Sequence, residues 1–252
     1  MAFQEELEQH GNWLFQRRSW LPLFLYPAAL LAMYCHPEVT HCFMAHDGWG
    51  LFCLAVSLAG LLVRALTIGF TPQGTSGRNT AQQVADSLNE TGMYSLVRHP
   101  LYLGNYLMWL GLLLFTGLWW FVVICSLIYW LYYERIIYAE EAFLRRQYGA
   151  RYEVWALCTP AFLPRLSGWV APPLAFSLRN VLKREYNGMF AVVVSLTLLH
   201  AISHQLVSED VGVAALRSVK PLWLVVFTIG SLAFLVLRTL KKNTRLLDIE
   251  GR

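Results

Sequence analysis

The sequence predicts an all-α, polytopic membrane protein with about six transmembrane helices and both termini cytoplasmic. Of its 252 residues, 56% are hydrophobic and only 14% are charged, which is typical of chains embedded in a bilayer. Apolar runs long enough to cross the bilayer recur along the chain. Lys and Arg gather on alternate connections between these runs, and the positive-inside rule makes that shared side cytoplasmic.

The N-terminal segment, residues 2–18, predicts an amphipathic helix at the membrane surface. Trp13, Arg17 and Arg18 would then lie at the level of the lipid head groups, although a plain polar segment explains the same residues equally well. The first spanning segment follows at 20–34 and is short for a bilayer crossing.

A clearer span covers residues 49–70 and contains Arg64. A charged side chain within a span marks a functional site, here a substrate-binding candidate, unless it extends to the interface. The connection between the first two spans is rich in metal-binding residue types: Cys35, His36, His41, Cys42 and His46. We expect a solvated loop there, with a metal site or a disulfide between the two cysteines as alternatives.

The polar stretch 71–91 predicts a short surface helix over 80–88, and a motif at the edge of an apolar run follows it. Pro100 suits the first turn of a helix and disfavours helical geometry at the residue before it. A helix should therefore begin at Pro100, with Arg98 and His99 just outside its positively polarised end, where an anion can bind.

The apolar run after Pro100 is too long for one crossing and predicts a hairpin of helices, 100–115 and 118–138. In the first helix, Gly104 and Gly111 share a face and allow a neighbouring helix to approach closely. The second helix continues out of the membrane, and Gly149 is expected to end it.

The polar end of this second helix carries three glutamates. Glu134 and Glu141 fall on one stripe, whereas Glu140 is turned about 100° away from Glu141. We therefore expect Glu140 and Glu141 to have different tasks, one of them at a solvated helix end. Glu134 is expected to be a buried partner of Arg98 or Arg64, or else to pair locally with Tyr138.

The C-terminal third predicts an interfacial segment over 156–185 and two further spans near 188–207 and 221–240. Arg179, Lys183 and Arg184 favour contact with anionic lipid head groups. The formal charge of +4 is small and says little about nucleic acid, and no basic tract with interleaved aromatic residues indicates that the chain binds it. The chain divides into an N-terminal segment, a core with the polar motifs and a C-terminal segment: 1–48, 49–166 and 167–252.

Two ordered motifs resemble those of the isoprenylcysteine carboxyl methyltransferase family and its bacterial relatives: Arg98-His99-Pro100-x-Tyr102-x-Gly104 and Glu140-Glu141-x-x-Leu144-x-x-x-Tyr148-Gly149-x-x-Tyr152. Phospholipid N-methyltransferases have related signatures. The resemblance covers about 50–166 and implies a multi-pass enzyme that encloses S-adenosylmethionine at the cytoplasmic face, with a lipid substrate arriving from the bilayer. The chain departs from the family at Tyr148, at Trp155 and in its longer C-terminal tail.

The resemblance implies roles for the motif residues. The cofactor would be held by His99, Pro100, Tyr102, Gly104, Glu140, Glu141 and Tyr148. Arg98 and Glu141 are the catalytic candidates, and the substrate candidates are Arg64, Arg98 and Glu134. No metal ligand is implied.

The expected reaction is O-methylation of a carboxylate or phosphate on a membrane lipid or lipidated substrate, at the cytoplasmic face of a bacterial inner membrane. Transfer to a phospholipid amine is an alternative within the same resemblance. A similar Arg-His-Pro signature occurs in NADPH-dependent sterol reductases, and a non-enzymatic membrane scaffold could retain the same fold. The short chain and the paired glutamates disfavour the reductase, and the intact polar motifs disfavour the scaffold.

Overall fold

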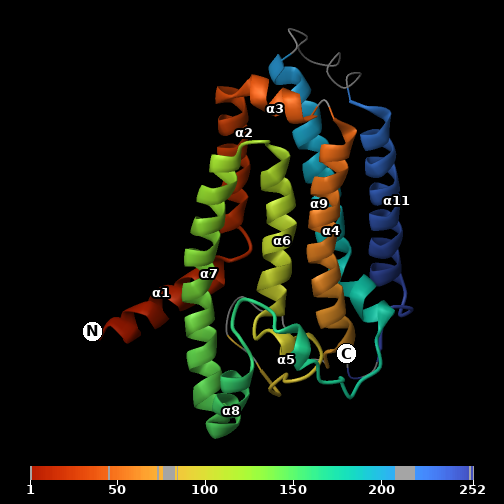
Figure 1. The fold of residues 1–252 in the computed structure, drawn as a ribbon. Coiled ribbons are helices and arrows are strands. Elements are labelled where there is room, and N and C mark those ends of the chain that lie inside the picture. Colours follow the sequence, from red (N-terminus) through yellow and green to blue (C-terminus); the bar gives the residue numbers. More distant parts are fainter. Residues whose placement is uncertain are drawn as a thin grey trace.

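The computed structural model describes residues 2–44, 46–72, 74–75, 83, 85–207, 219–249 and 251. Within these residues it is all-helical and contains no strand, which confirms the predicted fold class. Long helices lie side by side; the short helices α5 and α8 lie at the end that carries the C-terminus, and the short helix α3 lies at the opposite end (Figure 1). The elements are α1 (Phe3–Arg17), η1 (Leu21–Phe24), α2 (Leu25–Cys35), α3 (Pro37–Met44), α4 (Asp47–Phe70), α5 (Met93–Leu96), α6 (Pro100–Phe115), α7 (Trp119–Tyr148), α8 (Ala150–Cys158), η2 (Leu166–Gly168), α9 (Leu178–Val207) and α11 (Pro221–Asn243).

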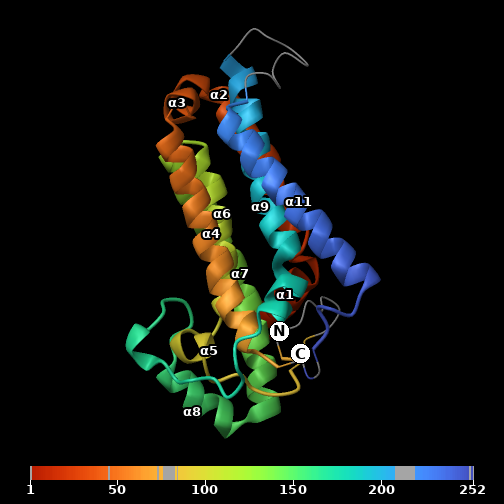
Figure 2. The same ribbon diagram turned by 90° about the vertical axis from the view of Figure 1, so that its right-hand side faces the viewer.

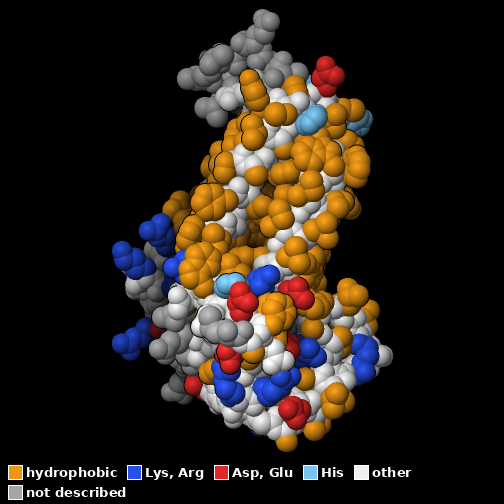
Figure 3. Space-filling view, turned by 90° about the vertical axis from the view of Figure 1, so that its left-hand side faces the viewer, with side chains coloured by type: hydrophobic (Ala, Val, Ile, Leu, Met, Phe, Trp, Pro, Cys, Tyr) orange, Lys and Arg blue, Asp and Glu red, His pale blue; other side chains and the backbone are white. Residues whose placement is uncertain are grey.

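Four helices in the described residues are long and apolar enough to cross a membrane: α4, α7, α9 and α11. The segment Leu21–Cys35 and helix α6 are apolar but shorter. These six segments coincide with the six predicted spans. That all six cross the bilayer, and that both termini are cytoplasmic, stays a prediction. Hydrophobic side chains cover the helical part of the face in Figure 3, and most charged side chains gather towards one end.

The hairpin was predicted correctly, because α6 begins at Pro100 and α7 ends at Tyr148, directly before Gly149. Gly149 has a φ of 53°, a conformation that glycine adopts without steric cost. The close approach at Gly104 and Gly111 is also confirmed. A Cβ atom at either position would collide with α4, which lies directly beside α6 (Figure 2).

The connection between the first two spans is a helix, α3, and the expected loop was wrong. Pro37 starts this helix, and the buried Thr40 hydroxyl donates a 3.0 Å hydrogen bond to the Thr116 carbonyl. Cys35 and Cys42 are both free. Across the part of the chain that the structure describes, no three His, Cys, Asp or Glu side chains lie close enough to hold a metal ion.

Two further expectations changed. Residues 80–82 and 84 of the helix predicted over 80–88 lie outside the described residues, and residues 83 and 85–88 are not helical. The polar residues up to Glu185 were expected in an interfacial segment, but α9 already begins at Leu178. The first turns of α9, which the predicted span near 188–207 did not include, bring Glu185 into the helix bundle.

Candidate functional site

The candidate site lies where α6 begins. Pro100 is the first residue of α6, and the Tyr102 and Leu103 amides bond to the His99 carbonyl at 3.1 and 3.2 Å. The Arg98 amide donates a 2.9 Å bond to the Pro160 carbonyl. The chain before the helix is thus pinned to the segment after α8, and the motif side chains project from a fixed backbone.

Arg98 is bound on several sides within the protein. Its Nε and Nη2 atoms lie 2.8 and 3.3 Å from the two carboxylate oxygens of Glu141. Its Nη1 atom donates to the carbonyls of Ala156 and Thr159, both at 2.8 Å, and so caps the end of α8. These bonds occupy four of the five guanidinium N–H groups. Arg98 was predicted to bind the substrate, which is expected to be an anionic acceptor. To bind such an acceptor with two hydrogen bonds, Arg98 would have to break its ion pair with Glu141.

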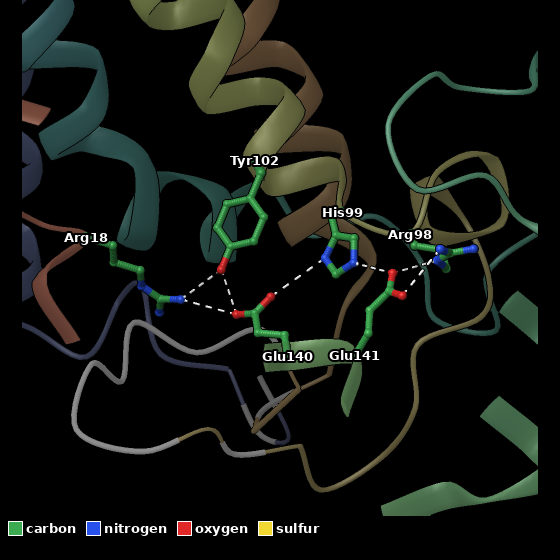
Figure 4. Close-up of polar contacts among 6 residues, drawn as sticks. All are labelled: Arg18, Arg98, His99, Tyr102, Glu140 and Glu141. Carbon is green, nitrogen blue, oxygen red and sulfur yellow. Dashed lines mark hydrogen bonds and ion pairs between the residues drawn. The ribbon is translucent and has the colours of Figure 1, made fainter. Parts of the chain in front are cut away.

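His99 lies between the two glutamates (Figure 4). Its Nε2 atom is 3.0 Å from Glu141 Oε1, and its Nδ1 atom is 3.6 Å from Glu140 Oε2. The expectation that one glutamate serves the site while the other is solvated was therefore wrong, since their side chains are only 21% and 18% exposed. The two side chains leave α7 in different directions but converge because the imidazole ring presents one nitrogen to each.

Glu140 also joins a second group of side chains. The Tyr102 hydroxyl donates a 2.6 Å bond to Glu140 Oε1, and Arg18 Nη1 lies 3.0 Å from that hydroxyl and 3.4 Å from the same oxygen (Figure 4). The sequence placed Arg18 among lipid head groups. Arg18 directly follows an amphipathic helix, and nothing in that sequence pattern indicates a role in the site.

Arg64 is held deeper between helices. It forms two 2.7 Å bonds to the Glu185 carboxylate on α9 and one 2.6 Å bond to Asn105 on α6. A Cβ atom at Gly104 would lie 2.5 Å from Arg64 Cγ, so the absence of a side chain there makes room for the arginine. Asn105 and Glu185 were both missed from the sequence.

Two other predicted site residues lie elsewhere. Glu134 is exposed on α7, so the expectation that it pairs with Arg98 or Arg64 was wrong. Glu134 lies on the same face of α7 as Glu141. Arg98 and the end of α8 cover that face only at the last turns of α7, beyond Glu134. Tyr148 donates a 2.6 Å bond to the Ala85 carbonyl and thereby holds a residue of the cavity wall.

The motif residues surround a cavity of about 580 Å³, within the usual size of small-molecule and cofactor sites. Burial, followed by the nearby Glu140 charge, raises the pKa of Tyr94 in its wall to about 12. Apolar side chains complete the walls. The principal lining residues are Phe15, Arg18, Arg64, Ile68, Leu88, Tyr94, Arg98, His99, Tyr102, Asn105, Glu140, Phe143, Leu144, Trp155 and Glu185.

Comparisons with known proteins place these motifs in context. The family model described as phospholipid methyltransferase matches residues 43–151, which contain the first motif and all of the second except Tyr152. The cobalt-zinc-cadmium resistance protein CzcN of Cupriavidus metallidurans is 32% identical over 163 residues, 61% of this chain and 72% of that protein. The nickel-cobalt-cadmium resistance protein NccN of Alcaligenes xylosoxydans xylosoxydans is 34% identical over 118 residues, 47% of this chain and 49% of its own length.

A eukaryotic relative is also similar. The protein-S-isoprenylcysteine O-methyltransferase of Schizosaccharomyces pombe is 33% identical over 73 residues, 29% of this chain and 31% of that protein. No solved structure matches the chain significantly. The family match ends before α9 and begins after α1, so both Arg18 and Glu185 lie outside it.

Proposed function

Because the chain belongs to the phospholipid methyltransferase family, we propose that it transfers a methyl group from S-adenosylmethionine to a lipid-embedded acceptor at the cytoplasmic face of the membrane. Family membership itself supports methyltransferase activity in a membrane protein. The observation that carries the proposal is the cavity at the start of α6, whose polar wall is built from His99, Tyr102 and Glu140.

The side chains around the cavity fit the groups of S-adenosylmethionine, which presents a carboxylate, an ammonium, a ribose diol and an adenine. Glu140 can accept hydrogen bonds from the ammonium or the diol. His99 and the adjacent helix start suit the carboxylate. Apolar lining residues such as Leu144 and Trp155 suit the adenine ring.

When bound, the cofactor would supply an electrophilic methyl group on a sulfonium. The protein's contribution would be to align the acceptor with that group and to exclude water, because an in-line displacement at the methyl carbon by an ionised acceptor depends mainly on positioning. The ring faces of Tyr102 and Tyr133, whose centroids lie 4.6 Å apart, offer a surface that suits a cationic group nearby.

We propose O-methylation of a carboxylate or phosphate as the reaction, and the O-methyltransferase from Schizosaccharomyces pombe supports this choice. The description of the matching family supports a second candidate, transfer to a phospholipid amine. Both acceptors would reach the cavity from the bilayer, because the site lies at one end of the apolar helices.

Calorimetric titration of the purified protein in detergent with S-adenosylmethionine and with NADPH tests the proposal. We expect saturable binding of S-adenosylmethionine and none of NADPH. Transfer of labelled methyl groups to N-acetyl-S-farnesylcysteine, phosphatidic acid and phosphatidylethanolamine then identifies the acceptor class. Binding of NADPH alone would support a reductase, and binding of neither compound would support a scaffold.

A further inference from the structure

Helix α1 contributes directly to the cavity although it lies outside the residues that match the family. Phe15, Arg18 and Ser19, at the end of this helix, all line the cavity. Arg18 is directed towards Tyr102 and Glu140 in Figure 4. Its side chain is only 16% exposed, and its guanidinium carbon lies 3.9 Å from the centre of the Phe15 ring. The arginine is therefore a fixed part of the cavity wall.

The docking of α1 on α7 determines where Arg18 lies. Gly11 packs against the Arg135 carbonyl and Ala139 of α7, so closely that any side chain at position 11 would collide with them. The Tyr132 hydroxyl donates a 3.3 Å bond to the carbonyl of Leu14. The glycine contact thus fixes the distance between the two helices two turns before Arg18.

Glu140 and Glu185 line the cavity, and Glu141 lies beside its lining residues Arg98 and His99. Each of the three carboxylates has one arginine partner, and the three pairs differ in how tightly they are held. Arg98–Glu141 and Arg64–Glu185 have contacts of 2.8 and 2.7 Å, whereas Arg18–Glu140 is longer, at 3.4 Å. The longer Arg18–Glu140 contact keeps Glu140 beside a positive charge, and the carboxylate oxygens can still accept hydrogen bonds from a ligand.

We propose that Arg18 is a positioning residue for cofactor binding, which acts by fixing the Glu140 carboxylate and the Tyr102 hydroxyl, and that docking of α1 on α7 delivers it. The inference rests on the proposed use of S-adenosylmethionine. Without Arg18, Glu140 loses a charged neighbour and can leave its position between His99 and Tyr102.

Calorimetric titration of the full-length protein with S-adenosylmethionine tests this role. Arg18→Ala should weaken binding roughly tenfold, as expected for the loss of a hydrogen bond to a charged group. Arg17→Ala is the matched control. Arg17 has the same charge, but its side chain lies over the Trp13 ring and bonds to the Trp13 carbonyl. It should bind the cofactor like the wild type.

A double-mutant cycle separates positioning from a general effect on the fold. If Arg18 acts through Glu140, Arg18→Ala should cost little further affinity in a Glu140→Gln background. Gly11→Leu, which forces α1 away from α7, should reproduce the loss of Arg18→Ala and add little to it. Gly48→Leu is its control, because a Cβ atom at Gly48 would meet nothing within 4 Å.

The outcomes are distinguishable. Failure of the wild type to bind S-adenosylmethionine overturns the proposed function and this inference with it. If the wild type binds and Arg18→Ala binds as tightly as Arg17→Ala, only the inference fails. Full additivity of Arg18→Ala and Glu140→Gln also overturns it, because the arginine would then not act through the carboxylate. If Gly11→Leu does not fold, the Arg18 cycle decides alone.

Discussion

Replacing Glu185 with leucine should destabilise the protein strongly. The change removes the carboxylate that makes both 2.7 Å bonds to Arg64. The side chains of Arg64 and Glu185 are only 16% and 5% exposed, so water can replace little of the lost interaction. Removing one partner of a buried ion pair typically costs about 3–5 kcal/mol. Since Arg64 keeps its 2.6 Å bond to Asn105, we expect a loss near the lower end, about 3 kcal/mol.

The assay is reversible unfolding in mixed detergent micelles, followed by far-UV circular dichroism. Lys183→Leu is the control on the same helix. Lys183 pairs with Asp248 at 2.7 Å, but the two side chains are 29% and 57% exposed, and such surface pairs contribute about 0–1 kcal/mol. The double variant Arg64→Met with Glu185→Leu should regain most of the lost stability, because replacing both ions with apolar residues of similar volume is often neutral or stabilising.

Two results would refute this reasoning. In the first, Glu185→Leu is tolerated as well as Lys183→Leu, which would mean that the buried pair contributes no more than a surface pair. In the second, the double variant is less stable than Glu185→Leu alone, which would mean that an unpaired Arg64 carries no penalty in its present surroundings.

Three other predictions address the site and the topology. Glu140→Ala and His99→Ala should each weaken binding of S-adenosylmethionine roughly tenfold in calorimetry, because each removes a charged or polar partner in the cavity wall; wild-type affinity in Glu140→Ala would contradict this. The methylation rate should change little between about pH 6 and 9, because a carboxylate or phosphodiester acceptor stays ionised there, whereas a steep alkaline rise would identify an amine acceptor. Labelling with a membrane-impermeant maleimide should place Cys42 and a cysteine introduced at Lys242 on opposite sides, and labelling on one side would exclude the six-span arrangement.

The parts of the fold that the sequence predicted correctly depend on local signals. Pro100 starts α6 because a proline fits the first helical turn, and Gly149 follows α7 because glycine tolerates its positive φ. The apolar runs coincide with helices because a bilayer requires long apolar segments. Spacing also predicted that α6 lies close to a neighbour through Gly104 and Gly111.

The partners of the charged residues could not be predicted in the same way. Glu185 follows Lys183 and Arg184, so its local context indicates an interfacial segment rather than a buried position beside Arg64. The stripe that predicted Glu141 in the site predicted Glu134 equally well, and only the packing of α8 distinguishes them. Which turns of a helix are covered depends on contacts between segments far apart in the sequence.

The three arginine–glutamate pairs explain how the cavity can hold so much charge beside apolar helices. Each pair joins two different elements: Arg98–Glu141 connects the start of α6 to α7, Arg64–Glu185 connects α4 to α9, and Arg18–Glu140 connects the end of α1 to α7. An unpaired charge would be costly at each position, so each pair favours the arrangement in which both of its elements are in place. Two of the pairs depend on residues outside the family match. Parts of the chain that the family match does not cover therefore complete the ion pairs around the cavity.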